Sequence, residues 1–569
     1  MKTIYFHQKS GFEDRFEIAL LNSMSNEESI KIQTFSKEQI NKYLPSKFEY
    51  DADSFDVLLI PTVFDSSNYM SYDGIEFALF WYFHLIKKEK PFAIVLLGTE
   101  STSSFFQHCD YSNFLKCPNV HYVHFNYEKI TAFLKRLDLK DFSSRDYLNA
   151  LKNVNLKPST SYKTHHSIAN EWAIYRWSNT IGATDKDIEK IENKVENQLY
   201  FKYLQSIFPI SDIPKIEENE LKIKHLQDSK ILYIDDEADK GWYEIFCKIL
   251  VDINEVQEFD YLGDELKDKS QEEIINLSLN KIKEQDTDIV ILDFRLHEND
   301  FTDDISEVTG LKILKEIKKI NPGIQVIIFS ATNKIWNLQA LQNAGADGFI
   351  VKESPENSVE SKFTEEIIRS FIYELYKANQ RRFLKRVFNL LNKISSNILN
   401  KDSIDETEFD GFLKLTLKQT EIIKASAKKL ELIDKSTIDI VYLNCFNFLE
   451  HFKNEYYLKY DTEDYAYYLG LEKSNVIRYS YNKNNFNITD HKIFVPNNVN
   501  DKPSFFNSLA CIIVDYFGLC DYENILIVKL AKVTEKRNKF IHGSKDHFDQ
   551  NELEIIIEIM EKLTNEMKE

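Results

Sequence analysis

The chain has 569 residues, which predicts about three or four domains. Hydrophobic residues make up 43% and charged residues 28% of the chain, as in ordinary soluble globular proteins. The formal net charge of −20 excludes a passive nucleic-acid coat, because phosphates would be repelled, so any nucleic-acid binding requires a local basic face.

We expect neither a membrane-spanning helix nor a signal peptide. Apolar runs stay shorter than the roughly 18 residues of a membrane-spanning helix. The first residues, MKTIYFHQKSGFEDRF, are polar where a signal peptide would have its apolar core. We therefore expect a cytoplasmic protein that does not contact a membrane.

The first 140 residues contain short apolar runs separated by polar stretches. They are TIYF (3–6), DVLLIPTVF (56–64), PFAIVLLGT (91–99) and YVHF (122–125). This rhythm is typical of a doubly wound α/β domain, which we place at residues 1–140.

Two helical patterns follow, at residues 167–182 and 186–208. Their apolar residues recur at helical spacing, which predicts amphipathic helices that pack on their neighbours. We assign them to a helical linker region over residues 141–226.

A clearer α/β pattern occupies residues 227–356. Its predicted strands are ILYI (231–234), DIVILDF (288–294) and QVIIFSA (325–331). Residues 311–320 predict a helix, and residues 337–352 predict a helix, a turn and a strand. This alternation predicts a second parallel sheet with helices on both faces.

Polar residues stand at the ends of these strands: Asp235 and Asp236, Asp293, Ser330 and Lys352. The carboxyl ends of parallel strands meet at one edge of a sheet, where ligands bind. Three carboxylates at that edge would repel each other unless a cation joins them, and an all-oxygen ligand set favours Mg²⁺. A nearby lysine and hydroxyl would suit a phosphoryl group on one carboxylate.

These residues, in this order, resemble the receiver domain of two-component response regulators over about 125 residues. The resemblance implies that Asp293 is the phosphoacceptor. It also implies that Asp236 and Asp293 bind Mg²⁺ directly, and that Asp235 acts through water. A receiver fold that no longer takes phosphate is the alternative, although an intact acidic cluster costs stability unless something binds it.

The same resemblance assigns the remaining polar positions. Ser330 and Lys352 would hold the phosphoryl oxygens. Phe349, three residues before the lysine, matches the switch aromatic, which turns inward when phosphorylation pulls Ser330 toward the phosphoryl group.

One loop departs from the family pattern. Receiver domains usually have a short loop with a proline after the phosphoacceptor and a glycine about eight residues on. Here the run is FRLHENDFTDDISEVTG (294–310), and Gly310 lies about nine residues late. Long loops of this kind are often functional, so partner choice or metal affinity can differ from the family pattern.

The first domain repeats the rhythm of the second without its acidic residues. DVLLIPTVF aligns with DIVILDFRL (288–296), which puts Pro61 at the position of Asp293. His7 and Gln8 stand where the acidic pair would be. Without these carboxylates the domain has neither a Mg²⁺ site nor a nucleophile.

One polar position of the alignment is kept. PFAIVLLGT aligns with PGIQVIIFS (322–330), so Thr99 matches Ser330. We interpret residues 1–140 as a degenerate receiver-like domain that binds a partner or ligand. The alternative is another doubly wound domain with a chance alignment.

From about residue 360 onward, helix follows helix, with strong patterns at 365–391, 505–519 and 551–563. A stretch at 454–504, rich in Tyr and Asn, has few periodic signals and predicts a loop-rich insertion. We expect an all-α bundle over residues 357–569.

The stretch ENILIVKLAKVTEKRNKFIHG (523–543) predicts a helix that ends just after His542, with Gly543 as its C′ residue. Asn538 and His542 are four residues apart and share a face, and the long side chain of Arg537 can bend toward the same end. Five lysines make this a local basic region: Lys529, Lys532, Lys536, Lys539 and Lys545.

An Arg and a His placed in this way can cleave RNA by the 2′-hydroxyl route. A histidine that titrates near neutral pH can take a proton from the 2′-hydroxyl or give one to the leaving 5′-oxygen. The arginine can stabilise the charged phosphate of the transition state. This route needs no metal and cannot cut DNA. Arg, four residues and His also recur by chance, so the spacing alone decides little.

In its helical, terminal context the motif resembles the HEPN domain, whose signature is Arg, about four to six residues and His, often with a polar residue after the Arg. The resemblance implies catalytic roles for Arg537, Asn538 and His542 and covers only these residues. HEPN ribonucleases usually pair two such helices across a homodimer. The alternatives are a non-catalytic HEPN domain and a capped helix end with a surface histidine.

Together these features predict two flavodoxin-like, receiver-type α/β domains followed by an all-α HEPN-like bundle. Our hypothesis is a response regulator, phosphorylated by a histidine kinase or another phosphodonor, whose effector is a metal-independent endoribonuclease with a toxin-like antiphage role. The alternative is a non-catalytic signalling adaptor whose helical domain mediates dimerisation or partner docking. We see no helix-turn-helix signature, so specific DNA binding is not expected.

Overall fold

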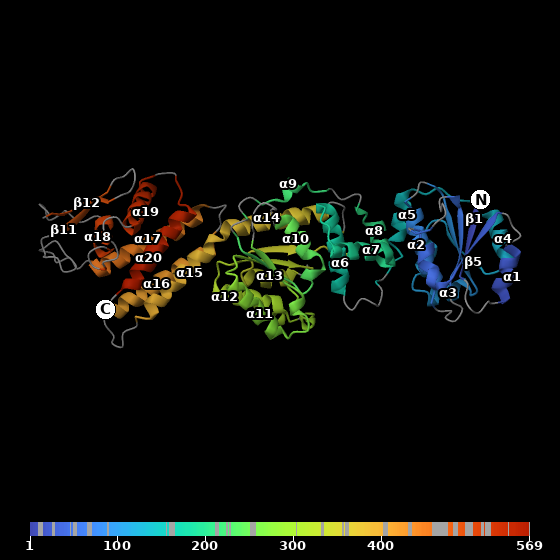
Figure 1. Ribbon diagram of the computed structural model, residues 1–569, viewed down its shortest axis with the longest axis horizontal. Helices are drawn as coiled ribbons and strands as arrows, with labels where there is room; N and C mark the ends of the chain where they lie inside the picture. Colours follow the sequence, from blue (N-terminus) through green and yellow to red (C-terminus); the bar gives the residue numbers. More distant parts are fainter. Residues whose placement is uncertain are drawn as a thin grey trace. The chain divides into compact units, whose positions relative to one another are not determined.

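The structure is a computed structural model of the chain (Figure 1). It describes residues 1–567 except 9–14, 25–28, 46, 49–53, 65–70, 88–89, 155, 157, 159–164, 211–214, 224–225, 227–228, 251–257, 303, 332–334, 356–357, 359–362, 402–407, 431–434, 458–475, 482–487, 495–504, 514–516, 518–524 and 544–545.

The chain forms two compact units. The first comprises Met1–Leu221, Asp239–Lys248 and Lys352–Arg369; the second comprises Lys222–Ala238, Ile249–Val351 and Ser370–Glu569. The domain boundaries expected from the sequence stay a prediction.

The first unit contains a sheet of five parallel strands in the order β2-β1-β3-β4-β5. The strands are β1 (Thr3–Gln8), β2 (Ile30–Phe35), β3 (Val57–Pro61), β4 (Ala93–Gly98) and β5 (Val120–His124). The helices and 3₁₀ turns between and after them are α1 (Arg15–Met24), η1 (Lys37–Tyr43), α2 (Asp73–Leu85), α3 (Thr102–His108), η3 (Ser112–Lys116) and α4 (Tyr127–Arg136).

Helices cover both faces of this sheet, as a doubly wound fold requires. In Figure 1, α1 and α4 lie on one side of the strands and α2 lies on the other. Leu20 of α1 and Ile130 of α4 pack with Tyr5, Val57 and Val95 of the strands in one buried cluster. The predicted α/β fold with a parallel sheet is confirmed for this region.

A run of helices follows in the first unit: α5 (Ser144–Leu151), α6 (His165–Ile181), α7 (Lys186–Asn197), α8 (Leu199–Ile207) and α9 (Glu218–Leu221). The two predicted helices are confirmed. The second is interrupted at Gln198, whose φ of −96° and ψ of 133° are extended, so α7 and α8 are separate helices.

A second parallel sheet has the order β10-β9-β8-β6-β7. Its strands are β6 (Ile231–Ile234), β7 (Phe259–Leu262), β8 (Ile289–Leu292), β9 (Gln325–Ser330) and β10 (Gly348–Val351). The connecting elements are η6 (Ala238–Lys240), α10 (Trp242–Leu250), η7 (Asp264–Leu266), α11 (Gln271–Glu284), η8 (Glu298–Asp300), η9 (Ile305–Glu307), α12 (Thr309–Ile320) and α13 (Ile335–Asn343).

The core of this sheet forms as its sequence predicts. The inner strands are rich in the β-branched residues Ile and Val and are fully buried, as expected of strands covered on both faces. Ile274 of α11 and Ile313 of α12 pack with Leu232 and Val290 in one cluster. The second predicted parallel α/β domain is therefore confirmed.

The C-terminal third consists mainly of helices. They are α14 (Phe363–Arg381), α15 (Phe383–Leu399), α16 (Glu408–Lys428), α17 (Lys435–Tyr457), α18 (Phe505–Cys511), α19 (Ile525–Ile541) and α20 (Gln550–Glu566). An antiparallel pair, β11 (Val476–Tyr481) and β12 (Ile488–Phe494), lies in the stretch predicted to be loop-rich. The remainder of 458–504 lies outside the described residues.

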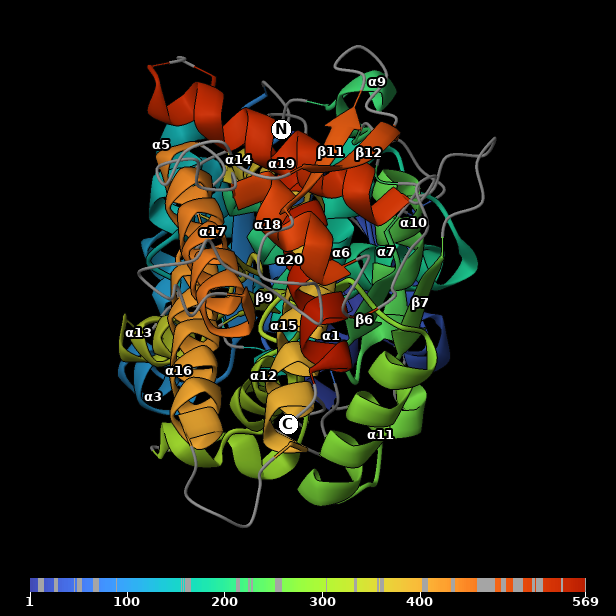
Figure 2. The ribbon, with the colours of Figure 1, turned by 90° about the vertical axis from the view of Figure 1, so that its left-hand side faces the viewer.

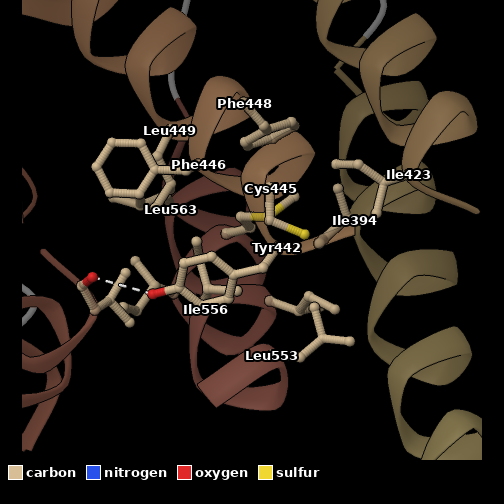
Figure 3. Packing of buried hydrophobic residues seen from close by; sticks show 14 of the residues in the cluster. Ile394, Ile423, Tyr442, Cys445, Phe446, Phe448, Leu449, Leu553, Ile556 and Leu563 are labelled. Atoms are coloured by element: carbon tan, nitrogen blue, oxygen red, sulfur yellow. Dashed lines mark hydrogen bonds between the residues drawn. The ribbon is translucent and has the colours of Figure 1, made fainter. Parts of the chain in front are cut away.

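The helical core is built by α15, α16, α17 and α20, which lie side by side (Figure 2). Close up, Tyr442, Cys445 and Leu449 of α17 pack with Ile556 and Leu563 of α20 (Figure 3). The buried Tyr442 hydroxyl donates to the carbonyl oxygen of Val533 at 3.0 Å, which ties α19 to α17. The predicted helical character of this region is confirmed.

Within the part of the chain that the structure describes, no helix is long and apolar enough to cross a membrane.

Candidate functional site

Three carboxylates meet at the carboxyl edge of the second sheet. Asp235 and Asp236 follow β6 and Asp293 follows β8, and these strands are in register because Ile234 lies beside Leu292. Each of the three carboxylates contributes one oxygen atom to a group in which all three oxygens lie within 4.8 Å of one another. The structure thus brings the predicted acidic cluster together.

Neighbouring groups hold Asp235 and Asp293 in place. Asp235 accepts hydrogen bonds from the Tyr233 hydroxyl at 2.5 Å and from the backbone N–H of Glu237 at 2.8 Å. Asp293 accepts one from the N–H of Phe294 at 2.6 Å. Burial, together with the charge of Asp235, raises the pKa of Tyr233 well above its usual value, so that phenol stays a neutral donor.

The donor set fits a magnesium ion. Asp235 and Asp293 are fully buried, so their charges repel strongly, and a divalent cation would relieve that repulsion. The cluster offers carboxylate oxygens and no sulfur or nitrogen, as Mg²⁺ prefers.

The other predicted positions lie on or directly after β9, which neighbours β8, and β10, which is the edge strand beyond β9. Ser330 ends β9, is 2% exposed, and pairs with Val351 of β10. Phe349 is half-buried and packs against the core of the second sheet. Lys352 directly follows β10 and is 1% exposed, and its Nζ lies 5.8 Å from the centroid of the Trp242 ring.

The residue after Lys352 is anchored to the helical linker, which the sequence did not predict. Glu353 is fully buried and forms an ion pair with Arg176 of α6, with 2.6 Å between Oε1 and Nε. The hydroxyls of Ser358 and Thr364 also donate to Glu353. Burial raises the pKa of Glu353, and the Arg176 charge and these hydroxyls offset part of that shift. The sequence offered one sign of this buried ion pair: Arg176 lies between Trp172 and Trp177 in a predicted helix with many apolar residues.

The long acidic loop after Asp293 is organised by one buried aspartate. Asp300 is fully buried and accepts hydrogen bonds from the backbone N–H groups of Leu296, His297 and Thr309. The Gln271 side chain of α11 donates to it as well, at 2.9 Å. Asp300 therefore joins the described residues at the two ends of this loop, around Leu296 and Thr309.

The late glycine of this loop has a steric role. Gly310 is the second residue of α12, and a Cβ placed there would lie 2.5 Å from the carbonyl oxygen of Asp293. Only a glycine lets α12 begin this close to the backbone of Asp293.

The first sheet carries different residues at the equivalent edge. His7 and Gln8 end β1, Pro61 ends β3, and all three are buried or part of a buried strand. The sequence alignment that matched Thr99 with Ser330 is wrong by one residue. Val57 pairs with Ala93 as Ile289 pairs with Gln325, so Gly98 occupies the place of Ser330.

Gly98 leaves room for an aromatic ring. By the same register Tyr122 stands where Phe349 stands in the second sheet. The Tyr122 ring packs so closely over Gly98 that a Cβ there would overlap it, and its hydroxyl donates to the carbonyl oxygen of Glu100 at 2.9 Å.

The C-terminal motif lies at the end of α19, as predicted. Gly543 has a φ of +93°, and its N–H donates to the carbonyl oxygen of Phe540, so it closes the helix as a C′ residue. Asn538 and His542 are exposed, and within the described residues the His542 side chain has no partner.

Arg537 is turned toward α17. Its guanidinium lies 4.7 Å from the centroid of the Phe446 ring, and Nη2 lies 3.6 Å from Glu450 Oε1. Nη1 donates to Asn538 Oδ1 at 3.3 Å. The structure therefore joins Arg537 to Asn538, while His542 projects separately from the helix end.

The lysines of α19 are largely neutralised. Lys529 pairs with Glu558, Lys536 with Glu552 and Lys539 with Glu535. Lys545 lies outside the described residues. The basic region predicted around the motif thus offers less free charge than the sequence suggests.

Comparison with known proteins agrees with the site at the second sheet. Residues 275–364 match the response regulator receiver domain family; the matched segment includes Asp293, Ser330 and Lys352 and begins after Asp235 and Asp236. Such domains take their phosphoryl group from a phosphodonor such as a histidine kinase and generally bind Mg²⁺ at the phosphorylation site. No curated protein matches the chain.

Solved structures add little. NtrX from Brucella abortus is 20% identical over 35% of this chain, with a TM-score of 0.20, and this chain spans 40% of its length. Two structures described as two-component system response regulator/GGDEF domain proteins are 10% and 12% identical, with TM-scores of 0.18; each match covers 66% of this chain and 99% of the other. TM-scores this low carry no inference about the present chain.

Proposed function

We propose that the protein is a phosphorylation-controlled response regulator whose effector is a metal-independent endoribonuclease of the HEPN type. The observation that supports control by phosphate is the three-carboxylate cluster of the receiver domain. The ribonuclease rests on Arg537 and His542 near the exposed end of α19.

In the phosphorylation step, a carboxylate oxygen of Asp293 attacks the phosphorus of a phosphohistidine or a small phosphodonor, and the bond to the leaving group breaks. Asp236 and Asp293 would hold Mg²⁺ directly and Asp235 through water, and the ion would neutralise the charge that meets there. Ser330 and Lys352 hold the phosphoryl oxygens of the product, with Phe349 as the switch aromatic.

In the cleavage step, the 2′-hydroxyl of the RNA attacks the adjacent phosphorus and the bond to the 5′-oxygen breaks. His542 moves the proton, and Arg537 stabilises the phosphate charge in the transition state. Asn538 lies beside Arg537 and orients its guanidinium. Two chains in a homodimer would supply a histidine each, one as base and one as acid.

The partners follow from this proposal: a histidine kinase or other phosphodonor, an RNA substrate and a second copy of the chain. A toxin-like role in antiphage defence rests on what proteins with HEPN domains commonly do.

Cleavage of total RNA in EDTA tests the enzyme. The wild-type protein should cleave, His542→Ala should lose about 10²–10⁴-fold in rate, and Arg537→Ala about 10²–10³-fold. His108→Ala is the matched control, because His108 is also an exposed histidine at a helix end. Equal cleavage by His542→Ala would remove the site assignment, and prior treatment with Mg²⁺ and acetyl phosphate shows the sign of the switch.

A non-catalytic signalling adaptor is the second candidate. The observation in its favour is that Arg537 lies against Phe446 and beside Glu450, as a packing residue would. An adaptor tolerates His542→Ala without loss of partner binding and shows no cleavage in any phosphorylation state.

A further inference from the structure

A hollow of about 460 Å³ lies within the second unit, between the end of α12 and the helices α15 and α16. Its lining carries five lysines and one acidic residue: Lys318, Lys319, Lys424, Lys428, Lys429 and Glu421. We call this site the lysine hollow. Its positive lining is unexpected in a chain with a net charge of −20.

The walls of the lysine hollow are firmly joined. The Asn321 side chain, just after α12, donates to the carbonyl oxygen of Lys385 at 2.9 Å and to Asn389 Oδ1 at 2.8 Å. A Cβ on Gly323 would collide with the backbone of Leu384, so the turn packs directly on α15. Pro322 and Phe388 contribute apolar surface to the lining. The shape of the hollow is therefore set by packed elements.

Part of its charge is balanced by neighbouring acids. Lys318 pairs with Asp347 at 2.5 Å, and burial lowers its pKa. Lys424 lies 2.9 Å from Glu421 and donates to the Ser395 hydroxyl at 2.7 Å.

The remaining lysines are available to a ligand. The Lys319 side chain is 76% exposed, and its Nζ makes a long, weak ion pair with Glu316 Oε2, at 3.5 Å. Lys428 and Lys429 are exposed, and their side chains have no partner among the described residues. Like charges that line one hollow repel each other, so an anion that binds among them is favoured.

The helix of the motif offers a contrast. Lys529, Lys536 and Lys539 are each paired with a glutamate there. A polyanion that reaches the C-terminal bundle therefore finds more unbalanced positive charge at the lysine hollow than along these three residues.

We propose that the lysine hollow binds the phosphate backbone of single-stranded RNA, the substrate class of the proposed ribonuclease, and this inference rests on that proposed function. A volume of this size accommodates a nucleotide-sized segment. Lysines act as point charges on phosphates, and several of them spread over two elements suit a chain of phosphates better than a single one.

Binding is measured in a His542→Ala background, so that the RNA stays intact. Fluorescence anisotropy of a labelled single-stranded RNA is recorded over a range of salt concentrations, with and without Lys428→Glu and Lys429→Glu together. The control is Lys414→Glu with Lys418→Glu, which makes the same charge change at exposed positions of α16, the helix that ends at Lys428, outside the hollow.

The double change in the hollow should weaken binding at least about tenfold, and the salt slope should fall by about 1.4, or about 0.7 for each lost phosphate contact. The control should stay within about twofold. Lys428→Gln with Lys429→Gln, which adds no negative charge, should give the same loss of slope; this keeps the test valid if the Glu variant misfolds.

Unchanged RNA binding by the hollow variants overturns the inference, as does competition by polyglutamate stronger than that by unlabelled RNA, which would indicate an acidic protein partner. The proposed function fails separately. If the wild-type chain does not cleave RNA but binds it through the hollow, the inference stands without the enzyme. If it cleaves RNA and the hollow variants bind and cleave as the wild type does, only the inference is lost.

Discussion

The sheet of β1–β5 and the sheet of β6–β10 have the same strand order, and their registers agree wherever they are compared. Thr3 pairs with Val57 in the first, as Ile231 pairs with Ile289 in the second. An aspartate just before the central strand accepts a hydrogen bond from a lysine N–H in both: Asp56 from Lys2 at 2.9 Å, and Asp288 from Lys230 at 3.1 Å.

The helix after the central strand also begins alike. Gly74 is the second residue of α2, as Gly310 is of α12, and each approaches the backbone that ends that strand. The two domains thus share a frame, by which we mean the strand order, the register, the aspartate before the central strand and the glycine at the start of the next helix.

The carboxyl edges are where the two sheets differ. One carries His7, Gln8 and Pro61, and the other carries three carboxylates. The frame is set by buried strands and a few backbone anchors, whereas the chemistry depends on side chains at one edge that the frame does not need.

The largest expected effect is on phosphoryl labelling, which should occur at the carboxyl edge of the second sheet and not at that of the first. Asp293→Asn should abolish labelling by ³²P-acetyl phosphate in the presence of Mg²⁺, because an amide oxygen is not a nucleophile toward phosphorus. The first sheet has no carboxylate at the equivalent position, so no residual labelling is expected there. Label found in peptides of residues 1–140 would contradict the contrast between the two sheets.

Magnesium should stabilise only the second sheet. At a hundredfold excess over its dissociation constant, the ion should add about 2.7 kcal/mol to local stability. Hydrogen–deuterium exchange of peptides from β6 and β8 should slow with Mg²⁺, while exchange of β1 and β3 peptides should stay unchanged.

The control for magnesium is Asp236→Asn with Asp293→Asn. This variant should lose the response, and without Mg²⁺ it should exchange more slowly than the wild type because the carboxylate repulsion is relieved. Equal protection of both sheets by Mg²⁺ would show that the effect is not due to the acidic cluster.

Much of the second sheet could be predicted because β6, β8, β9 and β10 are apolar runs that end in, or are followed by, a polar residue. Parallel strands must bring those ends to one edge, so the cluster of Asp235, Asp236 and Asp293 followed from the pattern. The edge strands β2 and β7 could not be predicted, since most of their residues are only half-buried and form no apolar run.

Other parts of the site were beyond the sequence. The Arg176–Glu353 pair joins residues far apart in the chain, and no local pattern indicates which buried charges meet. The match of Thr99 with Ser330 failed because it aligned Pro91 with Pro322, although β4 begins at Ala93 and β9 at Gln325. Backbone pairing fixes the register, which is one residue different.

The shared glycines sharpen the likeness of the frames. Gly74→Ala and Gly310→Ala should each cost about 1–3 kcal/mol, since the added methyl would overlap the carbonyl oxygen of Pro61 or Asp293. Each loss should be confined to its own sheet in hydrogen exchange, and Gly310→Ala should also slow the labelling of Asp293.

Gly411→Ala is the matched control for these two changes. Gly411 lies in α16 with nothing within 4 Å of an added Cβ, so alanine should be neutral or stabilise by up to about 1 kcal/mol. A neutral Gly74→Ala would mean that the two frames differ at this helix start.

The smallest effect concerns the anchor aspartate of the first sheet. Lys90 Nζ lies 2.6 Å from Asp56 Oδ1, and both side chains are partly exposed. Burial alone would raise the pKa of Asp56, but hydrogen bonds from Lys90 and from the Lys2 N–H, with the Lys90 charge, lower it overall. The stabilisation from Asp56 is therefore complete above the unfolded-state pKa of about 3.9 and is lost as the pH falls through the lower folded-state value.

Lys90→Met should cost less than about 1 kcal/mol at pH 7, and this difference from the wild type should vanish in acid. Urea unfolding followed by exchange of β3 peptides at both pH values measures it, with Lys87→Met as the exposed control. A cost that persists in acid would mean that Lys90 stabilises the strand by packing and not through the charge of Asp56.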